Sequence, residues 1–473
     1  MNSLNIIKNE IYDWLISHKE QFTDDLSQLI AIPSVEDDSD GAYPYGKNCA
    51  AAIDAMTALC EKYGFNTKNF NYHAATAVFE GKSKEIGLDI LSHLDVVAAG
   101  TGWNTEPFSL VQKNGFIFGR GVADDKGPAL ASLYAARALK ELGLLPEKSV
   151  KLIFGSAEET GSSDLKYYFK TEKSAPYTFT PDADFPVYNG EKGRYCAEFS
   201  MTCENETGAK INSFICGNAP NIVPEISRSS ICGIEAALVR EVAASLEKEL
   251  SVKYEIEEEN GFINLLCRGK SAHASTPHLG TNALTAMIKL LVSLPFDSNK
   301  SFDAFKSLAR LLPHGDTNGK NMGVYMKEDV SGEITVAFSM LHYDGKRLLG
   351  VCDSRLPFCA TYENSKAVFE KNLRECGFTA DGDMSNPHYV ENDSSFVKSL
   401  LKCYEAVTGL EGKTHVMGGG TYVHDIEGGV AFGPVFENID YDVNLHGANE
   451  CIKLSDLLLA ATIYAIAILE VAK

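Results

Sequence analysis

The sequence predicts an α/β domain with a mostly parallel sheet flanked by helices, into which a second domain of α+β type is inserted. The first third of the chain alternates apolar strand patterns with helical patterns, this alternation stops at about residue 189, and it resumes at about residue 387. A chain of 473 residues also exceeds what one hydrophobic core normally organises. We therefore expect the first domain over 1–188 and 388–473, and the inserted domain over 189–387.

The first domain is predicted from a regular order of strands and helices. Apolar runs predict strands over Leu88–Leu94, Val150–Gly155 and Tyr177–Thr180. Apolar residues at helical spacing predict helices over Ala129–Leu142 and Asp164–Phe169. Strands that alternate with helices in this way form a parallel sheet with right-handed crossover connections.

The inserted segment has a different pattern, in which hairpin-like strands precede a helix and further strands and a helix follow. The expected strands are Tyr195–Thr202, Lys210–Ile215, Gly261–Cys267 and Glu333–Leu341, and the expected helices are Ile234–Leu250 and Asn282–Leu294. After the insertion, the chain supplies the first domain with a helix over Ser394–Thr408, the glycine loop Gly418–Gly420 and a strand over Val430–Phe432.

The charge balance excludes two classes of partner. Lys and Arg number 43 and Asp and Glu number 64, which gives a formal net charge of −21. Such an acidic surface repels nucleic acid and anionic membranes, so neither is an expected partner.

The ends of the chain and its cysteines favour a cytoplasmic protein. Met1–Asp24 is amphipathic without an apolar core segment, which predicts a helix rather than a signal peptide. The apolar run Leu457–Leu469 is shorter than a membrane span and predicts a buried C-terminal helix. The 12 cysteines include no C-x-x-C pair, which disfavours zinc ribbon and thioredoxin-type sites. We expect reduced, mostly buried thiols.

Ionisable residues stand just beyond the predicted strands of the first domain. His93 and Asp95 follow the first of these strands, Glu158 and Glu159 the second, and Asp182 the third. Ligands of open α/β sheets bind outside the carboxyl ends of the strands, so these groups are expected to converge there.

Each motif alone also has a structural explanation. The triplet His93-Leu94-Asp95 can be a helix cap or a surface pair, and Asp124-Asp125 can be an acidic helix start favoured by the helix dipole. The pair Glu158-Glu159 is harder to explain as a solvated loop, because adjacent carboxylates repel each other unless a cation or a proton compensates.

The combined set of histidines and carboxylates suits a metal centre. Zinc accepts imidazole and carboxylate ligands, and two ions can share a bridging carboxylate. Mn²⁺ or Co²⁺ would also fit these donors. A metal bound by one glutamate of the pair leaves the other free as a general base.

With these motifs the chain resembles the aminoacylase, carboxypeptidase and dipeptidase family of co-catalytic zinc hydrolases, and within it the PepV-type bacterial dipeptidases, which include enzymes that act on β-alanyl dipeptides. The stretches that match the family follow its order and cover nearly the whole chain: Ser92–Asp95, Gly119–Gly127, Ser156–Glu159, Pro181–Asp184, Gly269–Ser275 and His446–Glu450. The closer match to the PepV type rests on Pro181–Pro186, Asn189–Gly193 and Gly418–Tyr422.

The resemblance implies roles for the residues of the first domain. Asp124 would bridge two Zn²⁺ ions, and Glu158 would be the general base for the attacking water and then protonate the leaving amine. Asp95 would orient an imidazole ligand. The remaining ligands would be His93 and Asp182 at one ion and Glu159 and His446 at the other, with Asp184 as the rival to Asp182. The Asp124–Asp125 peptide bond is expected to be cis, as in relatives.

In the inserted domain, the resemblance makes His273 an oxyanion stabiliser and Asn221 a second polar contact to the substrate. Arg355 would hold the substrate's C-terminal carboxylate, against the alternative of a surface arginine. Gly419 and Gly420 would line the substrate site. His424 departs from the family pattern, which leaves side-chain preference open.

The activity that the resemblance implies is metal-dependent hydrolysis of dipeptides by a monomer, whose enlarged lid domain supplies His273 in cis. Three alternatives stay open. They are an N-acyl amino-acid deacylase, a tripeptide- or carboxypeptidase-type member of the family, and a non-enzymatic metal-binding protein. A non-enzymatic protein would be expected to have lost a metal ligand or the general base. All six of these positions are intact: His93, Asp124, Glu158, Glu159, Asp182 and His446.

Overall fold

The computed structural model describes residues 2–37, 41–203 and 207–473, and it divides the chain into two compact units. Unit 1 comprises the chain up to Gly190 together with Tyr389–Val416 and Gly420–Lys473, and unit 2 comprises Glu191–His388 and Met417–Gly419. Unit 2 therefore takes His388 and Met417–Gly419 from the predicted first domain, and unit 1 takes residues 189 and 190 from the predicted insertion.

Met417–Gly419 belong to unit 2 because residues of that unit contact their backbone. Arg355 Nη1 donates a hydrogen bond to the carbonyl oxygen of Gly418 at 2.8 Å. The backbone N–H of Lys192 donates to the carbonyl oxygen of Met417 at 2.9 Å. The glycine loop is thus held by residues of unit 2.

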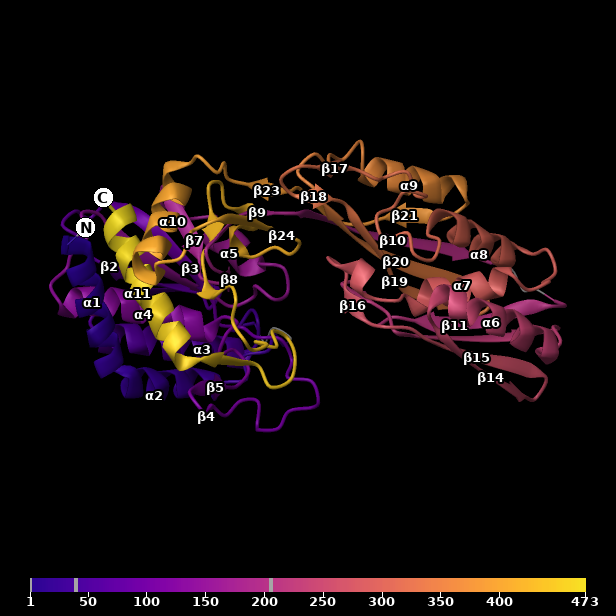
Figure 1. The fold of residues 1–473 in the computed structure, drawn as a ribbon, viewed down its shortest axis with the longest axis horizontal. Coiled ribbons are helices and arrows are strands. Elements are labelled where there is room, and N and C mark those ends of the chain that lie inside the picture. The colour runs from indigo at the N-terminus through magenta and orange to yellow at the C-terminus, as the bar shows by residue number, and fades with distance from the viewer. Residues whose placement is uncertain (1, 38–40, 204–206) are drawn as a thin grey trace. The chain divides into compact units, whose positions relative to one another are not determined.

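The main sheet of unit 1 has a parallel centre, as predicted, and antiparallel strands on both sides (Figure 1). Strand β3 runs parallel to both β6 and β7, and β7 runs parallel to β25. Strands β1 and β2 add antiparallel pairs beyond β6, and β9 pairs antiparallel with β25. In spatial order the strands are β1 (Asn66–Phe70), β2 (Ala74–Phe79), β6 (Ser149–Gly155), β3 (Ile86–His93), β7 (Tyr177–Thr180), β25 (Val430–Ala431), β9 (Val187–Glu191) and β23 (His388–Tyr389), and β24 (Thr414–Met417) also pairs with β9.

The helices of unit 1 cover this sheet, and short strands join its loops. The helices are α1 (Asn2–Ser17), α2 (Lys19–Ile30), α3 (Lys47–Lys62), α4 (Lys126–Glu141), α5 (Ser163–Tyr168), α10 (Ser395–Thr408), α11 (Leu454–Val471) and the 3-10 helix η2 (Tyr422–Asp425). The short strands are β4 (Val111–Lys113), β5 (Phe116–Phe118), β8 (Ala183–Asp184), β26 (Pro434–Val435) and β27 (Cys451–Lys453).

The prediction of one helix over Met1–Asp24 is wrong, because the segment forms two helices that break at His18. The imidazole of His18 stacks on the indole ring of Trp14, with ring centroids 3.9 Å apart. Its Nδ1 also bonds to the carbonyl oxygen of Trp14 at 2.8 Å. Residue Met1 of the predicted helix lies outside the described residues.

Helix α11 is the core helix of unit 1. Its 18 residues are long and apolar enough to cross a membrane by length and composition, so the expectation of too short a run is wrong. However, 72% of this segment is buried inside the protein, where it packs against α1, α4 and α10. The prediction of a buried C-terminal helix is therefore confirmed.

Unit 2 is built on a second nine-stranded sheet, whose strand pairs are antiparallel. In spatial order its strands are β14 (Lys253–Glu259), β15 (Phe262–Arg268), β13 (Ile226–Cys232), β11 (Lys210–Cys216), β19 (Thr335–Tyr343), β20 (Arg347–Leu356), β10 (Gly193–Thr202) and β21 (Thr379–Asp381), and β22 (Met384–Ser385) also pairs with β10. Short strands and a 3-10 helix complete the unit: β12 (Ile222–Val223), β16 (Ala272–His273), η1 (Pro277–Leu279), β17 (Lys327–Glu328) and β18 (Gly332–Glu333).

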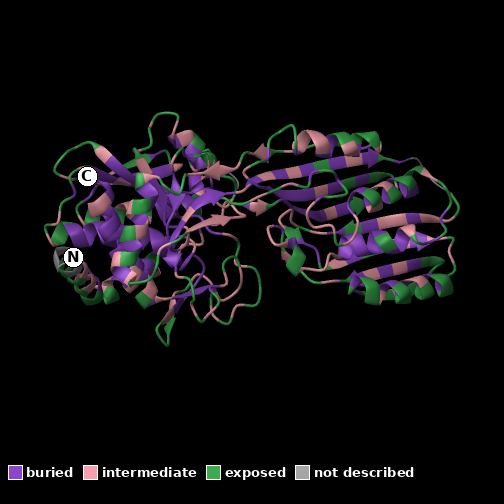
Figure 2. Cartoon of the chain, turned by 45° about the horizontal axis from the view of Figure 1, so that its top comes forward, coloured by how far each residue is buried: buried purple, intermediate pink, exposed green. Residues whose placement is uncertain are grey.

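One face of this sheet forms the core of unit 2 and the other does not. Along β10 the side chains of Tyr195, Ala197 and Phe199 are buried in a cluster with residues of the helices, while the residues between them are more exposed. Figure 2 shows this alternation as stripes along the strands. The helices that share this core are α6 (Ala236–Leu250), α7 (Ala283–Val292), α8 (Lys300–Leu311) and α9 (Lys366–Glu375).

Candidate active site

The ionisable residues predicted at the strand ends of unit 1 are brought together in space. His93 is the last residue of β3, Glu159 lies four residues after the end of β6, and Asp182 lies two residues after the end of β7. Asp124 precedes α4, and His446 lies in the loop that leads to β27. The carboxyl ends of parallel strands meet at one edge of a sheet, which explains the convergence.

Asp124 lies between two histidines and offers one carboxylate oxygen to each. Its Oδ1 is 2.9 Å from His93 Nε2, and its Oδ2 is 3.0 Å from His446 Nε2. Asp182 Oδ2 is 3.7 Å from the same nitrogen of His93, and Glu159 Oε2 is 3.2 Å from the same nitrogen of His446. The five groups therefore fall into two sets that share Asp124.

Donor atoms drawn from both sets are close enough to one another to hold a metal ion. The ligand atoms of His93, Asp124 and Glu159 lie within 4.8 Å of one another. The same holds for His93, Glu158 and Asp182, which places the Glu158 carboxylate beside the donors. The buried Glu159 Oε1 has no hydrogen-bond partner among the described residues, as expected of an oxygen that binds a cation.

Asp95 orients His93, but chiefly through its backbone. The Nδ1–H of His93 donates to the carbonyl oxygen of Asp95 at 2.9 Å, whereas the Asp95 carboxylate is 3.5 Å from that nitrogen. A protonated Nδ1 leaves the Nε2 lone pair facing the other donors, which is the form a metal ligand requires.

Two buried carboxylates hold the turn that carries Glu158 and Glu159. Asp95 accepts hydrogen bonds from the backbone N–H groups of both glutamates, at 3.2 and 3.0 Å. Asp164 accepts from the N–H groups of Ser156 and Ala157, at 2.6 and 3.0 Å. This turn is thus fixed by side chains from the loop after β3 and from α5.

Glu450 was not predicted to be a functional residue, although it ends the motif His446–Glu450. Glu450 is fully buried and accepts hydrogen bonds from the backbone N–H groups of Gly121, Ala123 and Asp124. It also pairs with the buried Arg120 at 2.7 Å. Glu450 therefore shapes the turn that presents Asp124, whose peptide bond to Asp125 is cis, as expected. The spacing of 326 residues between Glu450 and Asp124 leaves no local signal.

The electrostatics of this edge favour a bound cation. Burial and, to a smaller extent, the neighbouring Asp124 raise the pKa of Asp182 to about 7. Burial also raises the pKa of Glu158 well above its ordinary value. Hydrogen bonds to Asp124 and Glu159 raise the pKa of His446 to about 11. Several acids that share one buried site lose their mutual repulsion when a divalent cation lies among them.

Asp184, the rival ligand, lies apart from the donor sets. Its carboxylate accepts a hydrogen bond from the hydroxyl of Tyr188 at 3.3 Å, and burial raises its pKa. Asp182 is the residue whose oxygen lies among the donors.

Unit 2 brings together the predicted residues Asn221 and His273. Strand β12 pairs with β16, and the N–H of Ala274 donates to the carbonyl oxygen of Asn221 at 2.8 Å. The Nδ1 of His273 is 2.7 Å from Ser275 Oγ. A Cβ atom at Gly418 would lie 2.7 Å from the Cβ of Ser275, so the glycine loop passes close to the His273 segment.

Four other residues singled out from the sequence lie in or near this glycine loop. Arg355 is buried and bonds to Gly418, so the alternative of a surface arginine is wrong. Gly419 belongs to unit 2 and Gly420 to unit 1, and His424 is half-buried in η2.

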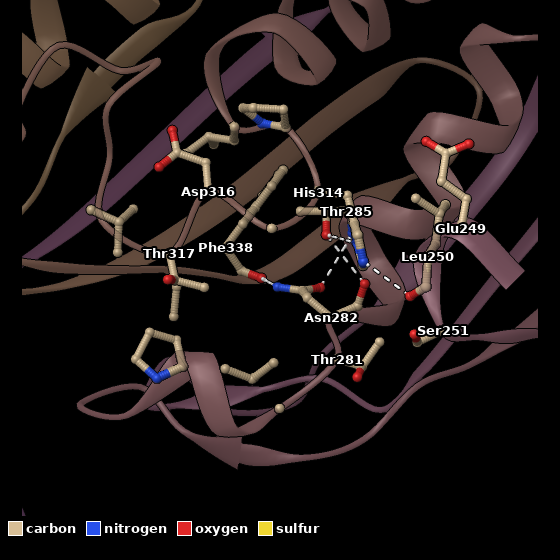
Figure 3. A pocket seen from close by; sticks show the side chains of 18 residues that line it. Glu249, Leu250, Ser251, Thr281, Asn282, Thr285, His314, Asp316, Thr317 and Phe338 are labelled. Carbon is tan, nitrogen blue, oxygen red and sulfur yellow. Dashed lines mark hydrogen bonds between the residues drawn. The ribbon is translucent and has the colours of Figure 1, made fainter. Parts of the chain in front are cut away.

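A separate cavity of about 240 Å³ lies within unit 2 (Figure 3). Its central polar residues bond to one another or to the backbone. His314 contacts Thr285 Oγ1 and the carbonyl oxygen of Leu250, at 2.9 and 3.2 Å, and Asn282 caps helix α7. These contacts show that His314, Thr285 and Asn282 stabilise the start of helix α7. Among the described residues, no group with metal-ligand geometry lies in this cavity.

The fold and the donor set define a class of protein, the metal-dependent hydrolases built on an open α/β sheet. The chain belongs to peptidase family M20/M25/M40, whose profile matches residues 90–470.

Similar proteins cover nearly the whole chain. It is 37% identical over 465 residues to the Beta-Ala-Xaa dipeptidase of Lactobacillus delbrueckii subsp. lactis, over 96% of this chain and 97% of the relative. It is 34% identical over 470 residues to the putative dipeptidase YtjP of Bacillus subtilis, over 97% and 99% of the two chains. The crystal structure of human carnosine dipeptidase 1 shares the fold, with a TM-score of 0.62 at 15% identity over 98% and 99% of the two chains.

Proposed function

We propose that the protein is a dinuclear metallopeptidase that hydrolyses the peptide bond of dipeptides, including β-alanyl dipeptides. The position of Asp124 between His93 and His446 carries the proposal, because its two carboxylate oxygens, one near each histidine, would be available to two cations. The 37% identity to a Beta-Ala-Xaa dipeptidase along the whole chain supports the substrate class.

The residues present fit two divalent cations, which we propose to be Zn²⁺, with Mn²⁺ or Co²⁺ as substitutes. Asp124 would contact both ions. His93 and Asp182 would complete one set of ligands, and Glu159 and His446 the other. When bound, such ions acidify water and polarise the scissile carbonyl.

Glu158 is the proposed general base. Its carboxylate lies beside the His93 and Asp182 donors, and Asp95 holds its backbone. Burial raises the pKa of this carboxylate, and a more basic carboxylate can take a proton from the attacking water and return it to the nitrogen of the leaving amine.

We also propose that unit 2 is the lid domain and contributes substrate contacts. His273 would donate to the developing oxyanion, Asn221 would add a polar contact, and Arg355 would bind the C-terminal carboxylate of the substrate. Gly419 and Gly420 would line the substrate site with their backbone. The free amine of a dipeptide distinguishes it from an N-acyl amino acid, the substrate of a deacylase.

A monomer in the reducing cytoplasm is the proposed setting. The cysteines Cys49, Cys60, Cys216, Cys267, Cys352 and Cys403 are buried as thiols. Burial raises the pKa of the Cys49 and Cys403 thiols to about 12, which keeps them protonated and unreactive.

The test is hydrolysis of a panel that contains β-alanyl-histidine, leucyl-glycine, a tripeptide and N-acetylated amino acids. Chelator-treated protein is assayed before and after return of Zn²⁺, Mn²⁺ or Co²⁺. Metal-restored cleavage of free dipeptides, lost in Glu158→Ala, is the expected result. Cleavage of acetylated compounds alone would indicate a deacylase, preferred cleavage of the tripeptide a tripeptidase, and no cleavage at all a non-enzymatic metal-binding protein.

A further inference from the structure

Two arginines and an aspartate form a compact cluster on unit 2. Arg194 of β10 and Arg355 of β20 are directly opposite each other in the antiparallel pair, and Asp353 lies two residues from Arg355 on the same strand. Residues with the opposite parity, such as Tyr195 and Cys352, belong to the core of unit 2. The three charged side chains therefore share the face of the sheet that does not form this core.

The carboxylate of Asp353 binds both arginines. It is fully buried, and its Oδ1 accepts a hydrogen bond from Arg355 Nε at 2.6 Å. Its Oδ2 accepts one from Arg194 Nε at 2.6 Å. Asp353 thus fixes the position of both guanidinium groups, because each arginine donates a short charge-assisted hydrogen bond to its carboxylate.

The two guanidinium groups differ in what they still offer. The side chain of Arg355 is 8% exposed, and its Nη1 also donates to the carbonyl oxygen of Gly418 at 2.8 Å. The side chain of Arg194 is 41% exposed, and among the described residues its hydrogen bonds come from Nε alone. Both Nη groups of Arg194 are therefore available to a ligand.

The charges of the cluster leave one positive charge uncompensated. Two guanidinium groups stand directly across a strand pair, where like charges repel each other. One carboxylate neutralises one of them. The cluster therefore favours a single additional anion, and a guanidinium group with two free Nη donors suits a planar carboxylate.

We propose that Arg194 is a second carboxylate-binding residue, which contacts the C-terminal carboxylate of the substrate beside Arg355. This inference rests on the proposed dipeptidase function. The cluster continues toward His273, because Arg355 bonds to Gly418, Gly418 lies against Ser275, and Ser275 contacts His273. The carboxylate site and the oxyanion donor are thus joined within unit 2.

The experiment compares Arg194→Met with the matched control Arg347→Met. Arg347 lies on the same face of β20, pairs across the strands with Thr202 and is exposed, so its loss removes an equal charge at a distance from Asp353. The metal-loaded full chain is assayed on leucyl-glycine and on leucyl-glycinamide, which lacks the carboxylate. If the amide is cleaved too slowly, its inhibition constant against leucyl-glycine replaces the rate.

The expected result is a rise in KM for leucyl-glycine of about tenfold or more in Arg194→Met, the effect of losing one hydrogen bond to a charged group. The kcat and all constants for the amide stay unchanged, and Arg347→Met behaves as wild type. An equal loss on both substrates, or no loss on leucyl-glycine, would overturn the proposal.

If Arg194→Met does not fold, Arg194→Lys is tested instead. Lysine keeps the ion pair with Asp353 but lacks the two Nη donors of the planar guanidinium group. A raised KM for leucyl-glycine alone supports the proposal, and an unchanged KM overturns it. A wild-type chain that cleaves no dipeptide contradicts the proposed function, and this inference falls with it. An active wild type that is insensitive to Arg194 removes this inference alone.

Discussion

The hydroxyl of Tyr422 donates a short hydrogen bond to the carboxylate of Asp164, 258 residues earlier in the chain. Asp164 also accepts hydrogen bonds from the backbone of the turn that leads to Glu158, so η2 supports that turn through Asp164. Gly155 permits the contact, because a Cβ atom there would lie 2.0 Å from the Tyr422 hydroxyl oxygen.

Removal of that hydroxyl is expected to slow catalysis. In Tyr422→Phe, Asp164 loses one donor and the turn before Glu158 loosens, so kcat should fall about tenfold while KM changes little. Steady-state kinetics and a melting curve check this. Tyr464→Phe is the control, because the buried Tyr464 hydroxyl has no partner among the described residues. Equal kinetics for the two variants would contradict a positioning role for Tyr422.

The choice between the two candidate aspartate ligands can be tested directly. Asp182→Asn should bind less metal after dialysis, because a neutral amide replaces an anionic donor, and Asp184→Asn should retain the wild-type content. Metal per chain, measured by mass spectrometry, distinguishes them. The reverse pattern would mean that Asp184 is the ligand.

The buried ion pair between Arg120 and Glu450 should matter for stability. Glu450→Gln leaves a buried guanidinium group without its counter-charge, which costs about 3–5 kcal/mol. Glu85→Gln removes the partner of Lys148 at the surface, where such pairs contribute less than about 1 kcal/mol. Urea unfolding measures both. If both variants lost a similar free energy of unfolding, the buried pair would contribute no more to stability than the surface pair.

Asp89, which is not among the proposed metal ligands, should make the stability of unit 1 depend on pH. Burial raises its pKa from 3.8 to about 6, although Lys151 and the N–H of Ala175 oppose that shift. The hydroxyl of Tyr168 also faces it from α5, and burial and Asp89 raise the pKa of that hydroxyl. Because the folded pKa exceeds the unfolded one, the folded state binds more protons, and stability decreases as pH rises from about 4 to about 6.

Asp89→Asn should remove this decrease. Relative to wild type, the free energy of unfolding of the variant should increase by roughly 2–3 kcal/mol between pH 4 and pH 7, because two pKa units correspond to about that energy. Urea unfolding at both pH values measures it. A difference that does not change with pH would refute the role of Asp89.

Much of the fold and the donor set could be predicted from local patterns. The strand over Tyr177–Thr180 is found with the predicted bounds, because a short apolar run between polar segments is a strong local signal. The helix expected from Ala129 begins at Lys126, since the turn before it is fixed by Glu450 and not by a local cap.

What the sequence did not reveal depends on contacts between distant residues. Glu450 and Asp164 each accept hydrogen bonds from backbone N–H groups of a turn. Neither the residue type nor the spacing in the sequence shows which N–H groups donate these bonds. The transfer of Met417–Gly419 to unit 2 likewise depends on Arg355 and Lys192, far away in the chain.

The insertion of unit 2 within unit 1 determines when the site can form during synthesis. Chains emerge from the ribosome amino end first, and domains generally fold as units in that order. All the proposed donors but His446 precede Glu191, yet β25, α11 and His446 follow the insertion. A nascent chain therefore completes the contiguous part of unit 2 before unit 1 has His446, the last of the proposed ligands. The proposed metal site can form only after both domains have been synthesised, so a chain that stops within unit 2 lacks one of its proposed ligands.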